Sequence, residues 1–172
     1  MKKLLCIMFA LAAVLSVSCK KENNDENGTW ICYKNGSNIA VALILDGKNC
    51  DYQITSWGER YTGTYTYSDG VLKMHITKFW STINSEGKNT FPDDETSLDN
   101  FQWTEHTTYY DKDISPWTYD VTVRWQDEKE VWHQSTTHKW FNANLDENND
   151  ITMQFIISGD TAEGDGFHFE RK

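Results

Sequence analysis

The fold class is decided by residues 60–76, RYTGTYTYSDGVLKMHI. Before the Asp-Gly pair, Tyr61, Tyr65 and Tyr67 fall on one side of an extended chain and threonines fall on the other. After the pair, apolar and polar residues alternate again. Asp-Gly is a preferred two-residue turn between antiparallel strands. These residues therefore predict a β-hairpin with one apolar and one polar face.

Similar short runs fill the rest of the chain, separated by turn residues, and helical periodicity is hard to find. The expected strands are 29–34, 39–45, 50–57, 60–67, 71–80, 101–110, 116–125, 130–141, 150–157 and 166–172. We therefore expect an all-β fold of about 8–10 antiparallel strands. Such a meander closes most simply into an up-and-down β-barrel, because closure removes exposed sheet edges. A two-sheet sandwich is the alternative.

Residues 81–100 interrupt the strand pattern with Gly87, Pro92 and a cluster of acidic residues. Loops of this length inside a compact domain are usually functional or mobile. The segment is expected to be either a functional loop or lid over the mouth of the barrel, or a disordered connection.

The N-terminus predicts export. Residues 1–18 have a basic start and an apolar core closed by small residues, as in a signal peptide. The sequence LSVSC that ends at Cys19 resembles the lipobox of bacterial lipoproteins, which implies that Cys19 carries the lipid anchor. An ordinary secreted protein with a free Cys19 thiol is the alternative. Residues 19–27 have too few apolar side chains to order themselves, so we expect a flexible tether.

The Lys and acidic cluster after Cys19 resembles a signal that sends lipoproteins of Gram-negative gut anaerobes to the cell surface. It implies an outer-membrane lipoprotein that faces the outside, with a periplasmic spacer as the alternative. The chain has 26 acidic and 16 basic residues and a net charge of −10. Nucleic acids need basic patches, so this balance argues against them as partners. The length of residues 28–172 fits one domain.

The start of this domain carries a family resemblance. Gly28 and Trp30 form a Gly-x-Trp at the first expected strand, and residues 63–72 have a Gly-Thr-Tyr-Thr-Tyr rhythm followed by Gly-x-Leu. Together they resemble the lipocalin-like domains of surface lipoproteins of Gram-negative gut anaerobes. The resemblance implies a barrel that binds an apolar or aromatic ligand, with Trp30 as a cap at its closed end. Arg171 is the candidate for the arginine that stacks on this tryptophan in lipocalins.

Signals for catalysis or a cofactor are missing from the sequence. There is no His-Glu-x-x-His or Gly-x-Ser-x-Gly motif. His133 and His138 share an expected strand but differ by an odd number, so they should point to opposite faces. We therefore expect a non-catalytic protein without a metal or other cofactor.

Two smaller features leave alternatives open. Asp146, Asn148 and Asp150 resemble the opening of a calcium loop, but the required glycine and glutamate are missing from later positions, and a polar hairpin turn explains them equally well. Cys32 and Cys50 could form a disulfide in an exported protein. Against it, their expected strands are two strand spacings apart.

Aromatic residues are the strongest remaining signal, with eight each of Trp, Tyr and Phe. Most should fill the core, because strands favour aromatic residues. In the first hypothesis a small hydrophobic or aromatic ligand binds inside the barrel, lined by Tyr61, Tyr65, Tyr67, Trp117 and Trp125. In the second, exposed tryptophans bind a glycan or a protein, or the domain is only an envelope component. The tryptophans expected near strand ends are Trp80, Trp103, Trp117, Trp125, Trp132 and Trp140.

Overall fold

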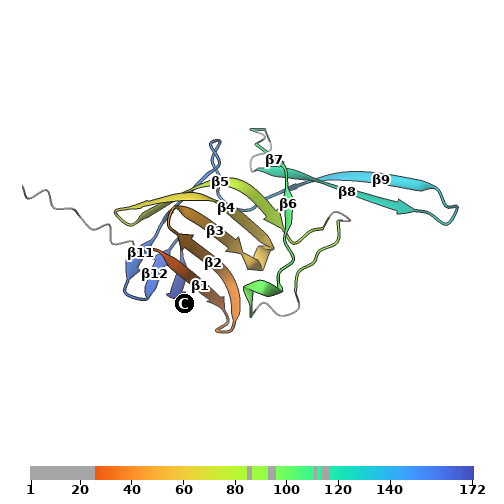
Figure 1. Cartoon of the computed structure of the whole chain (residues 1–172). Coiled ribbons are helices and arrows are strands. Elements are labelled where there is room, and N and C mark those ends of the chain that lie inside the picture. Colours follow the sequence, from red (N-terminus) through yellow and green to blue (C-terminus); the bar gives the residue numbers. More distant parts are fainter. Residues whose placement is uncertain (1–25, 85–86, 93–95, 111, 114–116) are drawn as a thin grey trace, which may run out of the picture.

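A computed structural model describes residues 26–84, 87–92, 96–110, 112–113 and 117–172 (Figure 1). The predicted signal peptide, the lipidation at Cys19 and most of the predicted tether lie outside these residues. The described chain is built from thirteen β-strands and two 3-10 helices of three residues each, and all strand pairs are antiparallel. The prediction of an antiparallel all-β fold is therefore confirmed. In this part of the chain no helix is long and apolar enough to cross a membrane.

The N-terminal half is the predicted five-stranded meander. Its strands are β1 (Gly28–Lys34), β2 (Asn38–Asp46), β3 (Asn49–Ile54), β4 (Glu59–Ser68) and β5 (Val71–Ser81). The third expected strand ends early, because the 3-10 helix η1 (Thr55–Trp57) turns the chain into β4. Tight turns with positive φ at Asn-Gly and Asp-Gly join the strands, as the sequence indicates.

The main sheet continues from both edges of this meander. Beside β1 lie β13 (Phe167–Arg171), β12 (Thr161–Gly164) and β11 (Ile156–Ser158), and beside β5 lies β10 (Asp150–Gln154), with β6 (Thr104–His106) pairing farther along β5. Only Phe155 separates β10 from β11 along the chain. In the main sheet, however, β10 and β11 are the two terminal strands of the order.

The predicted closed barrel is not found. Within the described ranges, the hydrogen-bonded strands form an open path of nine with β6 attached, and three further strands form a sheet of their own. The expectation of 8–10 strands was too low, because two expected strands are split and β12 forms between two others. The stretch 101–110 contains both β6 and β7 (Thr108–Tyr109), and Phe155 divides the stretch 150–157.

The separate sheet has the order β7-β8-β9, where β8 is Thr118–Gln126 and β9 is Trp132–Trp140. We call β8, β9 and the turn at residues 127–131 the ribbon. Figure 1 shows it projecting well beyond the main sheet. All nine residues of β9 are exposed, whereas the first half of β8 is mostly buried at the root of the ribbon. The sequence predicted both strands but placed them in the same meander as the others.

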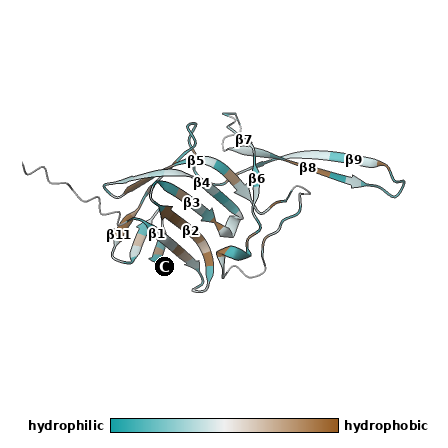
Figure 2. Ribbon diagram, in the orientation of Figure 1, coloured by the Kyte–Doolittle hydropathy of each residue, from teal (hydrophilic) through white to brown (hydrophobic). Residues whose placement is uncertain are grey.

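The main core cluster lies on one face of the main sheet, and a smaller cluster of Ile31, Ile39 and Ala42 is separate from it. In β4 and β5 the buried residues alternate with exposed ones as predicted, and Tyr61, Leu72, Met74 and Ile76 are completely buried. Other large buried side chains come from the N-terminal strands and from the C-terminal third of the chain, including Trp30, Leu43, Leu45, Phe141, Phe155 and Phe169. Figure 2 shows hydrophobic residues along β2 and mostly neutral or hydrophilic residues along the ribbon.

Gly63 lets β4 and β5 approach each other at a bulge. The pairing register shifts between Thr62 and Gly63. A Cβ atom on Gly63 would lie 1.9 Å from the carbonyl oxygen of His75, which is closer than any side chain permits. The glycine in the tyrosine-rich strand is therefore a requirement of backbone packing.

The described parts of residues 81–100 pack against the sheets. Ile83 and Asn89 form an isolated bridge, and Gly87 lies against Val121 and Val123 of β8. The 3-10 helix η2 (Leu98–Asn100) follows. This segment therefore supports the root of the ribbon, and its proposed role as a lid stays a prediction.

Candidate functional site

The tyrosines predicted to line a ligand cavity are packed among other side chains. Tyr61 is completely buried, and its ring contacts Phe79 and Phe141 at centroid distances of 6.1 and 5.4 Å. Tyr65 is buried as well, and its hydroxyl donates to the Asn27 side chain at 2.8 Å. Tyr67 is half-buried. These positions make the tyrosines part of the core.

The two tryptophans of the predicted ligand set lie apart from each other. Trp117 is buried, stacks on Phe79 at 5.8 Å and donates from its indole nitrogen to the carbonyl of Asp146 at 2.9 Å. Trp125 is 46% exposed and stacks on His133 of the ribbon at 5.4 Å. The structure therefore does not bring the five predicted ligand residues together in one site.

Exposed aromatic residues gather instead on and beside the ribbon. Of the eight large hydrophobic residues exposed in the described chain, six lie between residues 109 and 140. They are Tyr109, Tyr110, Trp125, Val131, Trp132 and Trp140. Large apolar side chains left in water on a projecting element are a sign of an interaction site.

The strand register assigns each ribbon residue to a face. Residues that pair directly across two antiparallel strands point to the same side. We call one side the tryptophan face, and its pairs are Thr118 with Trp140, Asp120 with His138, Thr122 with Thr136, Arg124 with Gln134, and Gln126 with Trp132. Trp125 and His133 lie on the opposite face, so the prediction that His133 and His138 point to opposite sides is confirmed.

The outer end of the ribbon is hollowed. A depression of about 490 Å³ is lined by Arg124, Trp132 and Gln134 of the tryptophan face and by His133 of the opposite face. The guanidinium of Arg124 donates to the side-chain oxygen of Gln134 at 3.1 Å, which ties together two planar groups in the lining of the hollow. Trp132 is 69% exposed. An exposed indole therefore lies next to fixed hydrogen-bonding groups.

The turn at the tip is ordered by one carboxylate. Asp127 accepts hydrogen bonds from the backbone amides of Lys129 and Val131 at 2.9 Å each, and its other oxygen contacts the ring of His133 at 2.9 Å. The contact with His133, followed by the amide bonds, lowers the pKa of Asp127. The network fixes the strand ends that carry Trp125 and Trp132.

The inner end of the tryptophan face has a second polar group. His138 contacts the carboxylate of Asp120 at 2.5 Å and the hydroxyl of Tyr109 at 2.9 Å. Trp140 lies beyond them and is 56% exposed. Between the two tryptophans the face presents hydroxyl, amide, imidazole and carboxylate groups. Such a surface can stack on an apolar face of a ligand and hydrogen-bond to its polar edges.

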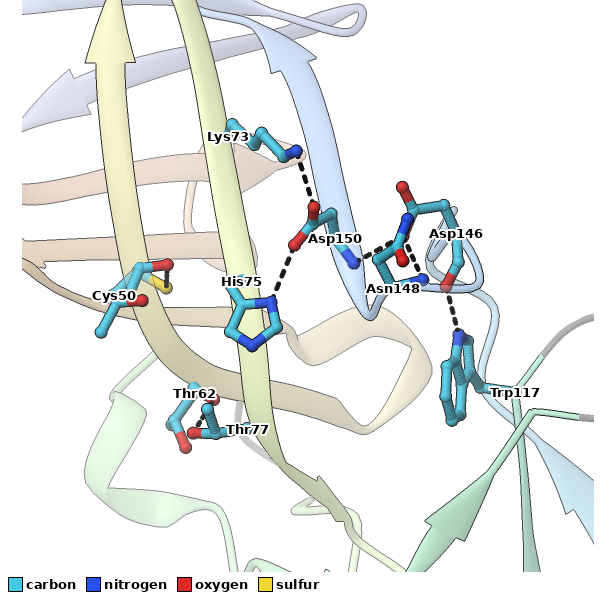
Figure 3. Close-up of polar contacts among 10 residues, drawn as sticks. Cys50, Thr62, Lys73, His75, Thr77, Trp117, Asp146, Asn148 and Asp150 are labelled. Atoms are coloured by element: carbon cyan, nitrogen blue, oxygen red, sulfur yellow. Dashed lines mark hydrogen bonds and ion pairs between the residues drawn. The ribbon is translucent and has the colours of Figure 1, made fainter.

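The stretch that resembled a calcium loop is a tight polar turn that leads into β10 (Figure 3). One carboxylate oxygen of Asp146 accepts from the backbone amides of Asn148 and Asp150 at 2.8 and 2.9 Å. The side chain of Asp150 is 2.7 Å from the Lys73 ammonium and 2.9 Å from His75. The described residues contain no group of three or more potential metal ligands.

We expect the pairing of Asp150 to give acid-sensitive stability. The hydrogen bond from Lys73, followed by that from His75, lowers the pKa of Asp150. A lowered pKa in the folded state stabilises the fold above the ordinary pKa of aspartate, about 4, and this gain is lost as the pH falls through the folded pKa. Asp150→Asn should therefore lower the melting temperature by a few degrees at neutral pH and by much less in acid. Thermal unfolding followed by circular dichroism at several pH values measures this.

The ion pair between Lys78 and Glu105 provides the control for that experiment. Its charged atoms are 3.2 Å apart, and both side chains are about half exposed. Surface pairs of this kind contribute little to stability. Glu105→Gln should therefore leave the melting temperature nearly unchanged. An effect of Asp150→Asn that is the same at every pH would contradict the electrostatic explanation.

A buried serine and a half-buried histidine also lie together. The hydroxyl of Ser81 is 2.7 Å from Nε2 of His106, and Ser81 Oγ also accepts from the backbone amide of Ile83 at 3.2 Å. Burial lowers the pKa of His106. Because Ser81 is almost completely buried, its hydroxyl is a structural hydrogen-bonding group that joins β5 to β6.

Cys32 and Cys50 are both free thiols and both buried. The structure therefore contains no disulfide between Cys32 and Cys50. Desolvation raises the pKa of Cys32, and raises that of Cys50 to about 12. Both thiols stay protonated at neutral pH and behave as small apolar core residues.

Trp30 lies in β1, the strand at which the N-terminal meander joins the C-terminal strands. Its ring is completely buried and packs at 5.4 Å, edge to face, on Phe155. The guanidinium carbon of Arg171 lies 4.3 Å above the ring, which confirms the predicted stacking of Arg171 on Trp30. The Trp30 indole also donates to the carbonyl of Glu26 at 2.8 Å, so ordered contacts begin inside the expected tether.

Comparison with known proteins adds no relative: no family model matches the chain, and no curated protein or solved structure matches it significantly.

Sequence reasoning listed Trp132 and Trp140 among tryptophans near strand ends but did not assign them to one surface, and it missed Arg124 and Gln134. The signal that would have found them is the shared parity of Trp132, Gln134 and Trp140, which places them on one face of a strand with no apolar residue between them.

Proposed function

We propose that this protein is an exported, lipid-anchored lipoprotein of the outer membrane whose ribbon binds a neutral glycan at the tryptophan face. The observation that carries the proposal is the hollow at the ribbon tip, where the exposed indole of Trp132 lies beside Arg124 and Gln134. Sugar rings have apolar C–H faces and hydroxyl edges. A flat aromatic ring next to planar hydrogen-bonding groups is complementary to both.

The position of the ribbon supports a ligand that approaches from outside. In the competing hypothesis, a small hydrophobic ligand would bind inside a lipocalin-like barrel. The inner face of the sheet is instead filled by contacts among the side chains that would line such a cavity, for example Tyr61 against Phe141. A large polymer can reach the ribbon without displacing any core residue.

The lipocalin-like barrel remains part of the proposal as an architecture. The stretch from β10 to β11 pairs with β5 through its first half and with β12 through its second half. One nearly continuous stretch therefore touches both sides of the strand order, as a wrapped sheet would require. The stacking of Arg171 over Trp30 supports the same comparison with lipocalins. In this proposal the wrapped sheet is a scaffold that holds the ribbon away from the membrane.

The net charge of the chain indicates which glycans to test. With a net charge of −10, the protein repels polymers rich in uronic acid or sulfate. Neutral polysaccharides are therefore the expected ligands. Lipidation at Cys19 and a tether would place the ribbon in the medium around the cell, where such polymers are met.

The test is a glycan array followed by isothermal titration with the best neutral polysaccharide. We expect Trp132→Ala to weaken binding about tenfold or more, because the stacking surface is lost. Trp57→Ala is the matched control, since Trp57 is 52% exposed but lies on η1, away from the ribbon. The proposal fails if the wild-type protein binds no glycan, or if the two variants lose affinity equally.

A further inference from the structure

The outer edge of β9 has no strand paired to it among the described residues. Within the part of the chain that the structure describes, β9 pairs with β8 alone and is the last strand of its sheet. It is nine residues long, fully exposed, regular in register, and free of proline and glycine. A long, regular edge strand presents unpaired backbone donors and acceptors to a second strand, and soluble proteins usually interrupt or cover such edges.

The sequence of this edge is nearly symmetric about its centre. It reads WHQSTTHKW, with Trp132 and Trp140 at equal distances from Thr136. When two copies of a strand pair antiparallel about a two-fold axis at the central residue, each position faces its mirror position in the other copy. In that register the first tryptophan of one copy is opposite the last tryptophan of the other, at both ends of the pair.

The side chains on the tryptophan face are compatible with this register. On the tryptophan face, Gln134 is opposite the second copy's His138, and Thr136 is opposite itself. Aromatic pairs, threonine pairs and hydrogen-bonding pairs directly across two strands are stabilising. Among antiparallel in-line registers of β9 with itself, only this one matches both tryptophans with tryptophans.

We propose that β9 is a homodimer interface, in which two copies join their ribbons edge to edge into one continuous six-stranded antiparallel sheet. The occupant of the free edge is a second copy of this chain, because the strand is complementary to itself. This inference goes beyond the proposed glycan site and does not depend on it, since the tryptophan faces of both copies remain on the same exposed side.

Thr136 provides the test, because the two-fold axis passes through it. Thr136→Lys and Thr136→Glu would each place two like charges directly opposite each other, about 5 Å apart. Each variant alone should be monomeric. Mixing the two variants should restore a dimer that contains one copy of each, since the opposed charges then attract.

Native mass spectrometry and sedimentation velocity of the full chain, over a wide concentration range, measure the result. Thr122→Lys is the control. Thr122 lies on β8 directly across from Thr136 and hydrogen-bonds to it. Thr122 is nevertheless one strand farther from the proposed two-fold axis than Thr136 is. It should dimerise like the wild type. Circular dichroism checks that all variants keep their β content. A monomeric wild type, or a mixture of Lys and Glu variants that stays monomeric, would overturn the proposal.

Discussion

Replacing Trp30 by alanine should lower the free energy of unfolding by about 3–5 kcal/mol, which is the range for removing a buried tryptophan side chain. The side chain is completely buried, and three separate interactions end on it. Phe155 packs edge-on at 5.4 Å, Arg171 lies over the ring at 4.3 Å, and the indole donates to Glu26 at 2.8 Å. The substitution removes all three and leaves a cavity.

The location of Trp30 makes its loss more than a local effect. Trp30 pairs with Arg171 in β13 and with Leu43 in β2, so it lies in the strand that joins the N-terminal meander to the C-terminal strands. Urea denaturation followed by tryptophan fluorescence and circular dichroism measures the change. Trp57→Ala, which removes a half-exposed tryptophan from η1, should cost far less. Equal losses for the two variants would contradict a core role for Trp30.

The first half of the fold could be predicted from the sequence because its signals are local. Turn dipeptides and period-two alternation in residues 60–76 specify a hairpin without any knowledge of distant residues. The alternation of Leu72, Met74 and Ile76 also identified the core face of β5 correctly. The stacking of Arg171 on Trp30 could be anticipated only through the family resemblance.

The ribbon could not be placed from the sequence because its departure from the main sheet is a long-range property. The first half of β8 has the apolar alternation of a core strand, with Tyr119 and Val121 buried. Nothing local distinguishes a strand that joins the main sheet from one that leaves it. The absence of apolar residues between Trp132 and Trp140 was the available signal, since such a strand has nothing to bury on either face.

The structure does not bring the five predicted ligand residues together, for a related reason. Tyr61 and Tyr65 were expected to face a ligand because they are aromatic and share a face with one another, and the core needs the same pattern. Sequence cannot tell a filled interior from a hollow one, because that depends on residues such as Phe141, which arrive from eighty positions away. Tryptophans on a strand without an apolar face are a better sign of a binding surface than aromatic residues on a strand that has a core face.

The second large effect is expected at Glu59, a buried carboxylate that fastens the inner end of the ribbon to β4. It accepts from the Tyr61 hydroxyl at 2.6 Å, from the Asn142 backbone amide at 3.0 Å and from the Asn142 side chain at 2.8 Å. Glu59→Ala should cost about 2–4 kcal/mol of unfolding free energy, because it leaves these buried donors without an acceptor. Urea denaturation measures the loss, and Glu59→Gln, which keeps the shape and one acceptor oxygen, should cost less.

The pH dependence of the stability of Glu59→Gln tests whether burial of the Glu59 carboxylate changes its pKa. Burial raises the pKa of Glu59, and the bonds from Tyr61 and Asn142 oppose that rise without cancelling it. The folded protein therefore holds this proton more tightly than the unfolded chain does. Wild-type stability should fall as the pH rises from the ordinary glutamate pKa, about 4.3, through the raised folded value.

Glu59→Gln has no proton to lose at this position, so its stability relative to the wild type should improve as the pH is raised from about 4 to about 7. Urea titrations of both proteins across this range give the difference directly. Asp150→Asn changes in the opposite sense, because the pKa of Asp150 is lowered, and it serves as the internal check on the sign. A wild-type-to-glutamine difference that stays constant with pH would show that Glu59 titrates alike in the folded and unfolded chains, and the desolvation argument would then be wrong.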